Sequence, residues 1–342
     1  LNKLSVIGGA SINNQLDTDL LLSFEYRKLK PTIYINIFGI TRNKKNLDVP
    51  LDGYGDTKVK ADLRFSLFET DIGINFKMLQ QKIWIEYIYQ KFRQRQTQNI
   101  SSIQQETNVD GNIGFDYFRG HLIKLKGLFS TRKPEFAGNM LPSNGYQIHY
   151  EFSYEYNQFM SDLDFDSGII ITEFNLNNTF RFILETQKNI TINQEQKIVA
   201  SINSKIGLIS NKEIDDFFHF FGGGMPGIKG YTFYDSTLTG SSLWINTASV
   251  RFPLMLEKNI KVFHLNIQNI SLGNIFQFGG GFDGNIDSWI SNQAYKMSSG
   301  IELRLRGYSF YAYPMAISFE YHLPINDKNE SSKSYFSILF DF

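Results

Sequence analysis

The residues of this chain that could perform chemistry are few, and their spacing fits no catalytic or metal-binding motif. The five histidines form no HExxH pair, and no other short metal-ligand spacing joins them. They are His121, His149, His219, His264 and His322. No G-x-S-x-G elbow and no phosphate-binding loop occurs. We therefore expect no catalytic residue, no metal site and no cofactor.

Two weaker candidates have simpler interpretations. His219 stands near Asp215, Asp216 and Ser236, a set that could form a hydrolase site at the rim of a barrel. Nothing in the sequence fixes their mutual geometry, and "DDFFHFF" reads better as the end of a strand and the start of a loop. The segment "GGGFDGN" at 279–285 lacks the spaced carboxylates of a calcium loop, so glycine in a strand and turn explains it better. We expect the protein not to be an enzyme.

The composition excludes some partners and favours a membrane. Lys and Arg total 34 and Asp and Glu total 34, so the chain has no net charge and no argument for nucleic-acid binding. Cysteine is absent, which excludes disulfides and thiolate metal sites. Aromatic residues make up 15% of the chain, which is typical of barrels that face lipid with Tyr and Phe. No run of about 18 apolar residues offers a transmembrane helix.

The elements that position these side chains alternate with a period of two, which indicates strands. In "YQIHYEFSYEY" the apolar and aromatic residues from Tyr146 to Tyr156 share one face, and Glu151 and Glu155 lie on the other. "KVKADLRFSL" and "IELRLR" repeat the pattern. Such strands run about ten residues or more, close to the length that crosses a bilayer at a tilt. A large soluble β protein, with the apolar faces inside, is the alternative.

Turn signals divide the chain into about sixteen strands, an even number, as closed bacterial barrels require. The expected strands are 18–28, 31–41, 56–68, 71–79, 82–93, 109–118, 121–132, 145–157, 166–175, 177–188, 197–209, 241–254, 258–282 (or only its second half), 293–307, 311–323 and 333–342. Long connections such as 133–144 and 283–292 are expected mostly on one side of the sheet and short turns on the other. The long segment 42–55 falls on the short-turn side and breaks this rule. Residues 1–17 are expected to be a linker or an extra strand, and 18–342 the barrel.

The last expected strand ends on an aromatic residue. "SYFSILFDF" places Phe336, Ile338, Phe340 and Phe342 on one face. A closed barrel must pair this strand with the first, because an open edge in lipid leaves backbone groups unsatisfied. A terminal Phe on an alternating strand also resembles the C-terminal signal by which outer-membrane barrels are recognised for assembly. An ordinary edge strand that ends in Phe is the alternative.

One glycine-rich stretch interrupts the alternation and carries a family resemblance. "FFGGGMPGIKGYTFYD" combines three glycines at 222–224 with the tetrad Ile228-Lys229-Gly230-Tyr231, and the strand after it ends in "RFPL" at 251–254. This pattern resembles the sixth extracellular loop and following strand of the BamA-type outer-membrane translocator superfamily, the bacterial surface antigen barrels. "GIELRLRGYSFYAYPMAISFEYHLP" resembles the penultimate strands of that family, so the resemblance covers about 215–342.

The resemblance implies an all-β transmembrane barrel whose glycine-rich loop inserts into the lumen between strands eleven and twelve. In that family the loop is anchored to the inner wall by its tetrad, so the implied latch residues are Gly224, Ile228, Lys229, Gly230 and Tyr231. Glycine allows close backbone approach, and a buried cation requires a carboxylate partner. A flexible external loop is the alternative.

Two departures from the family pattern affect the latch. Lys229 stands where the family has Arg, so the bidentate fork is replaced by a point charge. The matching stretch "IFQFGGGFD" puts Phe278 where the family often has Asp. By face alternation, Glu302 and Glu320 are the expected substitutes as partners of Lys229.

The function that the resemblance implies is protein insertion or export at the outer membrane, through a weak seam between the first and last strands. The expected partners are outer-membrane lipid, unfolded outer-membrane proteins or other secreted cargo, and periplasmic accessory domains, with no nucleic acid. The expected location is the bacterial cell outer membrane. The alternative function is a passive plugged barrel that serves as an anchor or pore for an upstream domain.

Overall fold

The computed structural model describes residues 4–12, 16–50, 58–98, 112–132, 144–166, 169–211, 216–233, 235–283, 295–310, 313–327 and 330–340. The chain divides into two compact units. Unit 1 contains residues 1–78, 82–125 and 153–180, and unit 2 contains 79–81, 126–152 and 181–342.

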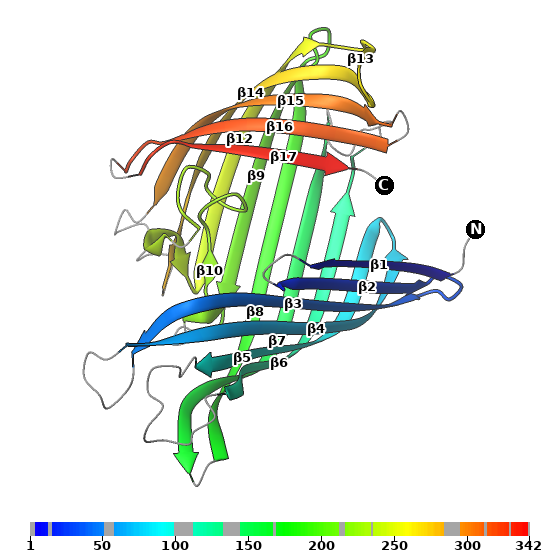
Figure 1. The fold of residues 1–342 in the computed structure, drawn as a ribbon. Coiled ribbons are helices and arrows are strands. Elements are labelled where there is room, and N and C mark those ends of the chain that lie inside the picture. Colours follow the sequence, from blue (N-terminus) through cyan, green and yellow to red (C-terminus); the bar gives the residue numbers. More distant parts are fainter. Residues whose placement is uncertain are drawn as a thin grey trace. The chain divides into compact units, whose positions relative to one another are not determined.

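The described residues form one 15-stranded sheet whose strands follow one another in chain order (Figure 1). Every pairing whose register is described is antiparallel. The strands are β1 (Leu4–Ile12), β2 (Thr18–Tyr26), β3 (Thr32–Pro50), β4 (Lys58–Met78), β5 (Gln81–Gln98), β6 (Asn112–Ser130), β7 (Gly145–Asp166), β8 (Ile169–Asn193), β9 (Ile198–Ile209), β12 (Ser242–Met255), β13 (Ile260–Val262), β14 (Leu265–Phe282), β15 (Lys296–Ser309), β16 (Tyr313–Pro324) and β17 (Lys333–Phe340). The architecture is an all-β meander, close to the expected sixteen strands.

Three predicted strand pairs are single long strands, so the turns predicted inside them are wrong. In β4 the apolar residues occupy odd positions up to Leu67 and even positions from Phe68. From the sequence alone, this change predicts a turn. "FETD" at 68–71 contains neither Gly nor Pro to make a turn, and the pairing with β3 continues through it. Likewise 109–118 and 121–132 lie in β6, and 166–175 and 177–188 lie in β8.

These longer strands also correct the expected sides of the connections. Because adjacent strands are antiparallel, successive connections alternate between the two ends of the sheet. Because the turn predicted at 69–70 is absent, the alternation that placed 42–55 on the short-turn side no longer holds. Within residues 1–17, Leu4–Ile12 forms β1 and pairs with β2.

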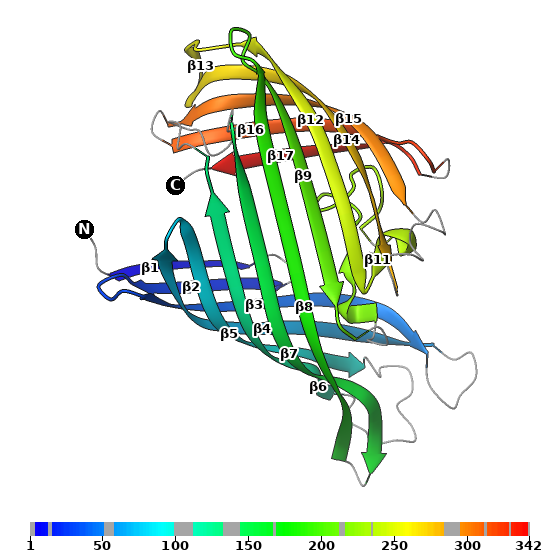
Figure 2. The ribbon, with the colours of Figure 1, turned by 180° about the vertical axis from the view of Figure 1, so that it is seen from behind.

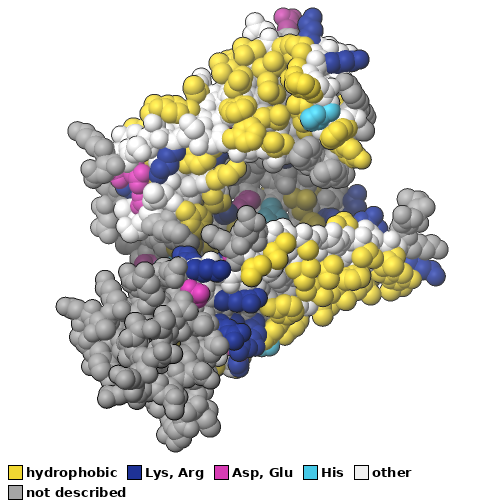
Figure 3. All heavy atoms as spheres, in the orientation of Figure 1, with side chains coloured by type: hydrophobic (Ala, Val, Ile, Leu, Met, Phe, Trp, Pro, Cys, Tyr) yellow, Lys and Arg dark blue, Asp and Glu magenta, His cyan; other side chains and the backbone are white. Residues whose placement is uncertain are grey.

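The two faces of the sheet are inverted relative to a soluble protein. In β15 and β16 of unit 2 the exposed residues include Ile301, Leu303, Phe319, Tyr321 and Leu323, and the buried ones include Ser298, Glu302, Ser318, Glu320 and His322. Unit 1 repeats this, with Ile33, Ile35, Ile72 and Tyr87 exposed and Glu86, Glu155 and Asn157 buried. Hydrophobic side chains accordingly cover much of the visible surface of each unit (Figure 3). Contiguous apolar surface of this kind marks a face that is covered by something other than water.

The helices of the described part are the single turns η2 (Asp216–Phe218) and η3 (Ser236–Leu238). None of the helices in these ranges is long and apolar enough to cross a membrane.

Candidate functional site

The irregular segment between β9 and β12 forms a compact structure of its own within unit 2. A short hairpin of β10 (Phe220–Phe221) and β11 (Thr239–Gly240) closes its base, with Phe220 opposite Gly240. The Asp235 carboxylate caps η3 by accepting from the backbone N–H of Thr237 at 2.9 Å. Between these elements runs Gly222–Asp235, which we call the glycine-rich loop.

Glycine is required in this loop because backbone lies against backbone. The N–H of Ile228 donates to the carbonyl of Gly222 at 2.7 Å, and Gly223 and Ile228 form a bridge. A side chain at Gly223 would collide with the carbonyl of Thr232. Gly224 and Gly230 adopt φ of 74° and 98°, which other residues rarely adopt. The sequence pattern therefore has a steric cause.

Two apolar residues of the tetrad anchor the loop against the sheet. Ile228 is 0% exposed and Tyr231 is 1% exposed. The Tyr231 hydroxyl lies 2.8 Å from the carbonyl oxygen of Met297 and 3.0 Å from Oδ1 of Asn326. Burial raises the pKa of this hydroxyl to about 12, which favours the protonated form that can donate to one of these oxygens. The ammonium group of Lys296 lies 5.4 Å from the centre of the Tyr231 ring.

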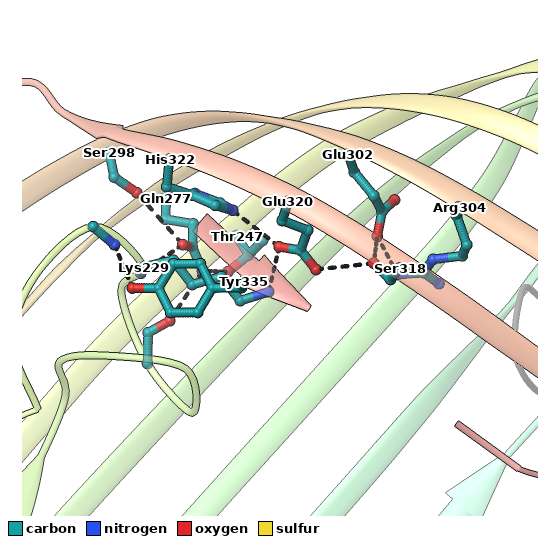
Figure 4. A network of polar contacts seen from close by, with 12 residues as sticks. Lys229, Thr247, Gln277, Ser298, Glu302, Arg304, Ser318, Glu320, His322 and Tyr335 are labelled. Carbon is teal, nitrogen blue, oxygen red and sulfur yellow. Dashed lines mark hydrogen bonds and ion pairs between the residues drawn. The ribbon is translucent and has the colours of Figure 1, made fainter. Parts of the chain in front are cut away.

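Lys229 reaches the polar face of the sheet, where it forms an ion pair with Glu320 on β16 (Figure 4). Its ammonium group also lies 5.9 Å from the centre of the Tyr335 ring on β17, within the range of a cation–π contact. The side chains of Lys229 and Glu320 are 18% and 8% exposed. Because little water reaches this position, the two charges stabilise each other, and removing one side chain would leave the other charge without its ion-pair partner.

The backbone around Lys229 is held by neutral groups of two further strands. The N–H of Lys229 donates to Oε1 of Gln277 on β14 at 2.9 Å, and the N–H of Gly230 donates to the hydroxyl of Tyr335 at 2.9 Å. Gln277 in turn donates to the carbonyl of Gly227 at 3.1 Å. The tetrad is thus tied to β14, β16 and β17 at once.

One contact of the loop with β14 was not predicted from the sequence. Phe278 was expected at the position where the family often has Asp, but its ring packs against Trp244, with the ring centres 5.8 Å apart. Gln277 is the residue that faces the loop. Because successive side chains of a strand point to opposite faces, a shift of one residue exchanges an apolar neighbour for a polar one. Alternation in "IFQF" is the signal that could have found Gln277.

Of the two expected carboxylates, Glu320 lies beside Lys229, and Glu302 is engaged elsewhere. Glu302 forms ion pairs with Arg251, at 2.7 Å, and with Arg304. Ser318 links the two carboxylates, since its hydroxyl lies 3.3 Å from an oxygen of each. Nε2 of His322 lies 2.9 Å from the other oxygen of Glu320. One polar network therefore joins the loop to β12, β14, β15 and β16 (Figure 4).

The remaining sequence candidates lie as follows. Phe336 and Ile338 point outward from β17, and the side chains of Phe340 and Phe342 lie outside the described residues. Nδ1 of His219 lies 3.4 Å from Asp216, Ser236 is exposed, and Asp215 is outside the described residues. In the ranges that the structure describes, no group of three or more His, Asp or Glu side chains could hold a metal ion.

The fold matches solved structures of known proteins. BamA from Haemophilus ducreyi lacking POTRA domains 1–3 matches with a TM-score of 0.50 and 10% identity, over 99% of this chain and 71% of that one. CdiB from Acinetobacter baumannii matches with a TM-score of 0.55 and 11% identity, over 99% and 53%. This chain has the fold of BamA and CdiB. CdiB from Escherichia coli matches similarly, at 0.55 and 9%, over 98% and 55%.

The chain thus spans a little over half the length of the two CdiB chains. No protein-family model and no curated protein sequence matches it. At identities near 10% the likeness to BamA and CdiB is one of fold.

Proposed function

We propose that the chain is an outer-membrane β-barrel of the translocator type, which acts in the insertion or export of proteins. The location is supported by the exposed apolar face and the buried polar face of each unit. In this proposal the sheet closes on itself, because an open edge in hydrocarbon would leave backbone groups without partners. The polar face then lines the lumen, and the glycine-rich loop lies inside it.

The observation that carries the proposal is the attachment of the glycine-rich loop to the last strands. Lys229 binds β16, Gly230 binds β17 and Tyr231 binds β15. The attachment consists of one ion pair and a few hydrogen bonds around it. Such contacts hold the last strands in place at rest and can exchange when a client chain pairs with their edge.

A passive plugged barrel is the second candidate, and one observation favours it. Glu302 and Glu320 are both engaged in ion pairs, so neither carboxylate needs a further cation as a partner. A barrel with a static plug serves as an anchor for another domain. Lipid is the expected partner in both cases, whereas unfolded outer-membrane proteins and periplasmic accessory domains are expected only in the first.

The first experiment tests the membrane barrel itself. The chain is refolded into phospholipid vesicles and examined by gel electrophoresis with and without boiling. A folded barrel should migrate differently before and after heating and should leave the vesicles only with detergent. Extraction by carbonate, with no change in migration, would overturn the membrane assignment and support the soluble alternative.

The second experiment separates the translocator from the plug. A urea-unfolded outer-membrane protein is diluted into vesicles with or without the folded chain, and its acquisition of protease resistance is followed over time. A translocator should accelerate this step relative to vesicles that hold an unrelated barrel of similar size. Equal rates, together with the absence of ion conductance in planar bilayers, would favour the passive plugged barrel.

A further inference from the structure

Two adjacent turns of unit 2 bring exposed apolar side chains together at one end of the sheet. β13 is joined to β14 through Phe263 and His264, and the turn after β15 begins at Phe310. The His264 and Phe310 rings stack with centres 4.6 Å apart, and the N–H of Phe310 donates to the carbonyl of His264 at 2.7 Å. We call Phe263, His264 and Phe310, with Ile260 and Val262, the apolar tip. It lies at the opposite end of β12 from β11 and the glycine-rich loop (Figure 2).

The phenylalanines of the apolar tip are unusual residues for turns that face water. Phe263 is 93% exposed and Phe310 is 66% exposed. Both adopt left-handed backbone conformations, with φ of 51° and 48°. Gly, Asn and Asp are the residues that turns of this kind normally use, because a bulky side chain is strained there. Phe263 and Phe310 therefore bear backbone strain while exposing their rings, and a non-aqueous surrounding would account for both.

The apolar tip continues the exposed apolar face of the strands. Phe252 and Leu254 on β12, Leu272 on β14 and Leu303 on β15 are exposed on that face. A register shift between Ile267 and Asn269 moves the apolar residues of β14 from odd to even positions. The face consequently stays apolar up to the turn. A local protein contact would explain a single patch, whereas a lipid layer explains apolar exposure on both the strands and the turns.

Charge at the tip fits a phospholipid headgroup. Lys258 and Lys261 are exposed on the connection between β12 and β14, next to the apolar side chains. Aromatic rings with neighbouring lysines are the composition that membrane interfaces select, since rings enter the acyl boundary and ammonium groups bind phosphate. The turn after β8, at the same end of the sheet, is built differently. It reads Gln194-Glu195-Gln196-Lys197, and Lys197 pairs with Glu257.

We propose that the apolar tip inserts into the headgroup–acyl boundary of an anionic phospholipid leaflet, with Lys258 and Lys261 binding lipid phosphates. The inference rests on the proposed membrane barrel and adds a lipid-binding element to it. The strained turns then anchor the end of the sheet opposite the glycine-rich loop at a fixed depth in the leaflet.

The test uses single cysteines, which is straightforward because the chain contains none. An environment-sensitive fluorophore is attached to Phe263→Cys, Phe310→Cys, Glu195→Cys or Ile301→Cys in the full chain, refolded into vesicles of phosphatidylglycerol and phosphatidylcholine. Bromine on the upper acyl chain is the quencher. Labels at 263 and 310 should be quenched at least about twofold more than the label at 195, as for groups buried in the interface.

The label at 301 distinguishes a failure of this lipid-binding proposal from a failure of the proposed membrane barrel. If 301 is quenched and 263 and 310 are not, the apolar tip lies in water, and this proposal fails while the membrane barrel stands. If 301 is not quenched either, the membrane barrel fails first. Shielding of 263 in native membranes but not in vesicles would overturn lipid in favour of a protein partner.

The lysines are tested separately in the 263-labelled chain. Lys258→Gln with Lys261→Gln should weaken quenching in phosphatidylglycerol vesicles and leave it unchanged in vesicles of phosphatidylcholine alone. An equal change in both lipids would overturn the phosphate contacts.

Discussion

The glycine-rich loop and the apolar tip both contain residues with positive φ, but the residues differ in type. In the loop, Gly224 and Gly230 are buried, and their φ values of 74° and 98° are ones that other residues rarely adopt. At the tip, Phe263 and Phe310 adopt the same region and point outward. In the buried loop, glycine adopts the positive φ without strain. At the exposed tip, an aromatic residue adopts a positive φ despite the strain.

This difference in residue type accompanies two different sources of stability for the sheet. The loop is held from within, through side chains of the polar face that are nearly dry. In our proposal the tip is held from outside by lipid. Changes in the loop should therefore act on stability in any surrounding, whereas changes at the tip should depend on the bilayer.

The largest effect is expected at the ion pair. Lys229→Ala leaves Glu320 charged and 8% exposed, and the loss of one partner of a buried pair costs about 3–5 kcal/mol. Unfolding by guanidinium in detergent micelles, or the temperature at which the folded gel band disappears, would measure it. Glu257→Gln is the matched control, because it breaks an exposed pair with Lys197 and should change stability little.

A double variant distinguishes the charge from the packing. Lys229→Ala combined with Glu320→Gln removes the unpaired charge and should recover much of the lost stability. If the double variant is as unstable as the single one, the lysine stem and its packing matter more than the ion pair. If Lys229→Ala itself melts like the parent, the latch is absent.

A smaller effect is expected where the loop backbone packs on itself. Gly223→Ala places a methyl group against the carbonyl of Thr232, and overpacking of this kind costs about 1–3 kcal/mol. Gly9→Ala is the control, because no heavy atom lies near its added methyl group, and alanine in a strand gains about 0.5–1 kcal/mol over glycine. Opposite signs in the unfolding free energies would confirm the steric account. Similar small gains at both positions would show that the loop relaxes freely.

Much of this arrangement follows from alternation alone. The faces of β15 and β16 were readable from their period of two, and the same alternation proposed Glu320 as a substitute partner for Lys229. It could not separate Glu320 from Glu302, because both point to the polar face and are paired with each other across β15 and β16. Which carboxylate meets Lys229 depends on the path of the loop backbone. That path is irregular, so it leaves no periodic pattern in the sequence.

The errors also have identifiable causes. Gln277 was missed because the sequence was searched for a carboxylate partner of Lys229, whereas Gln277 binds the backbone of the loop through neutral hydrogen bonds. The continuity of β4 was missed because a change of apolar phase looks like a turn until the partner strand shows unbroken pairing. The apolar tip was invisible because the strain at Phe263 and Phe310 lies in the backbone angles and not in the residue pattern.

The smallest effect is expected from glycine at the two kinds of turn, and its sign decides what surrounds the tip. Lys197 and Phe263 both have φ of 51°, so glycine relieves the same strain at each. Lys197→Gly should therefore raise the unfolding free energy in vesicles by about 0.5–1 kcal/mol. Phe263→Gly gains the same relief but loses an aromatic side chain whose full burial is worth about 1.5–3 kcal/mol. Its stability in vesicles should accordingly fall or stay level. An equal gain for both variants would mean that the ring of Phe263 meets only water, and the contrast between loop and tip would then be one of sterics alone.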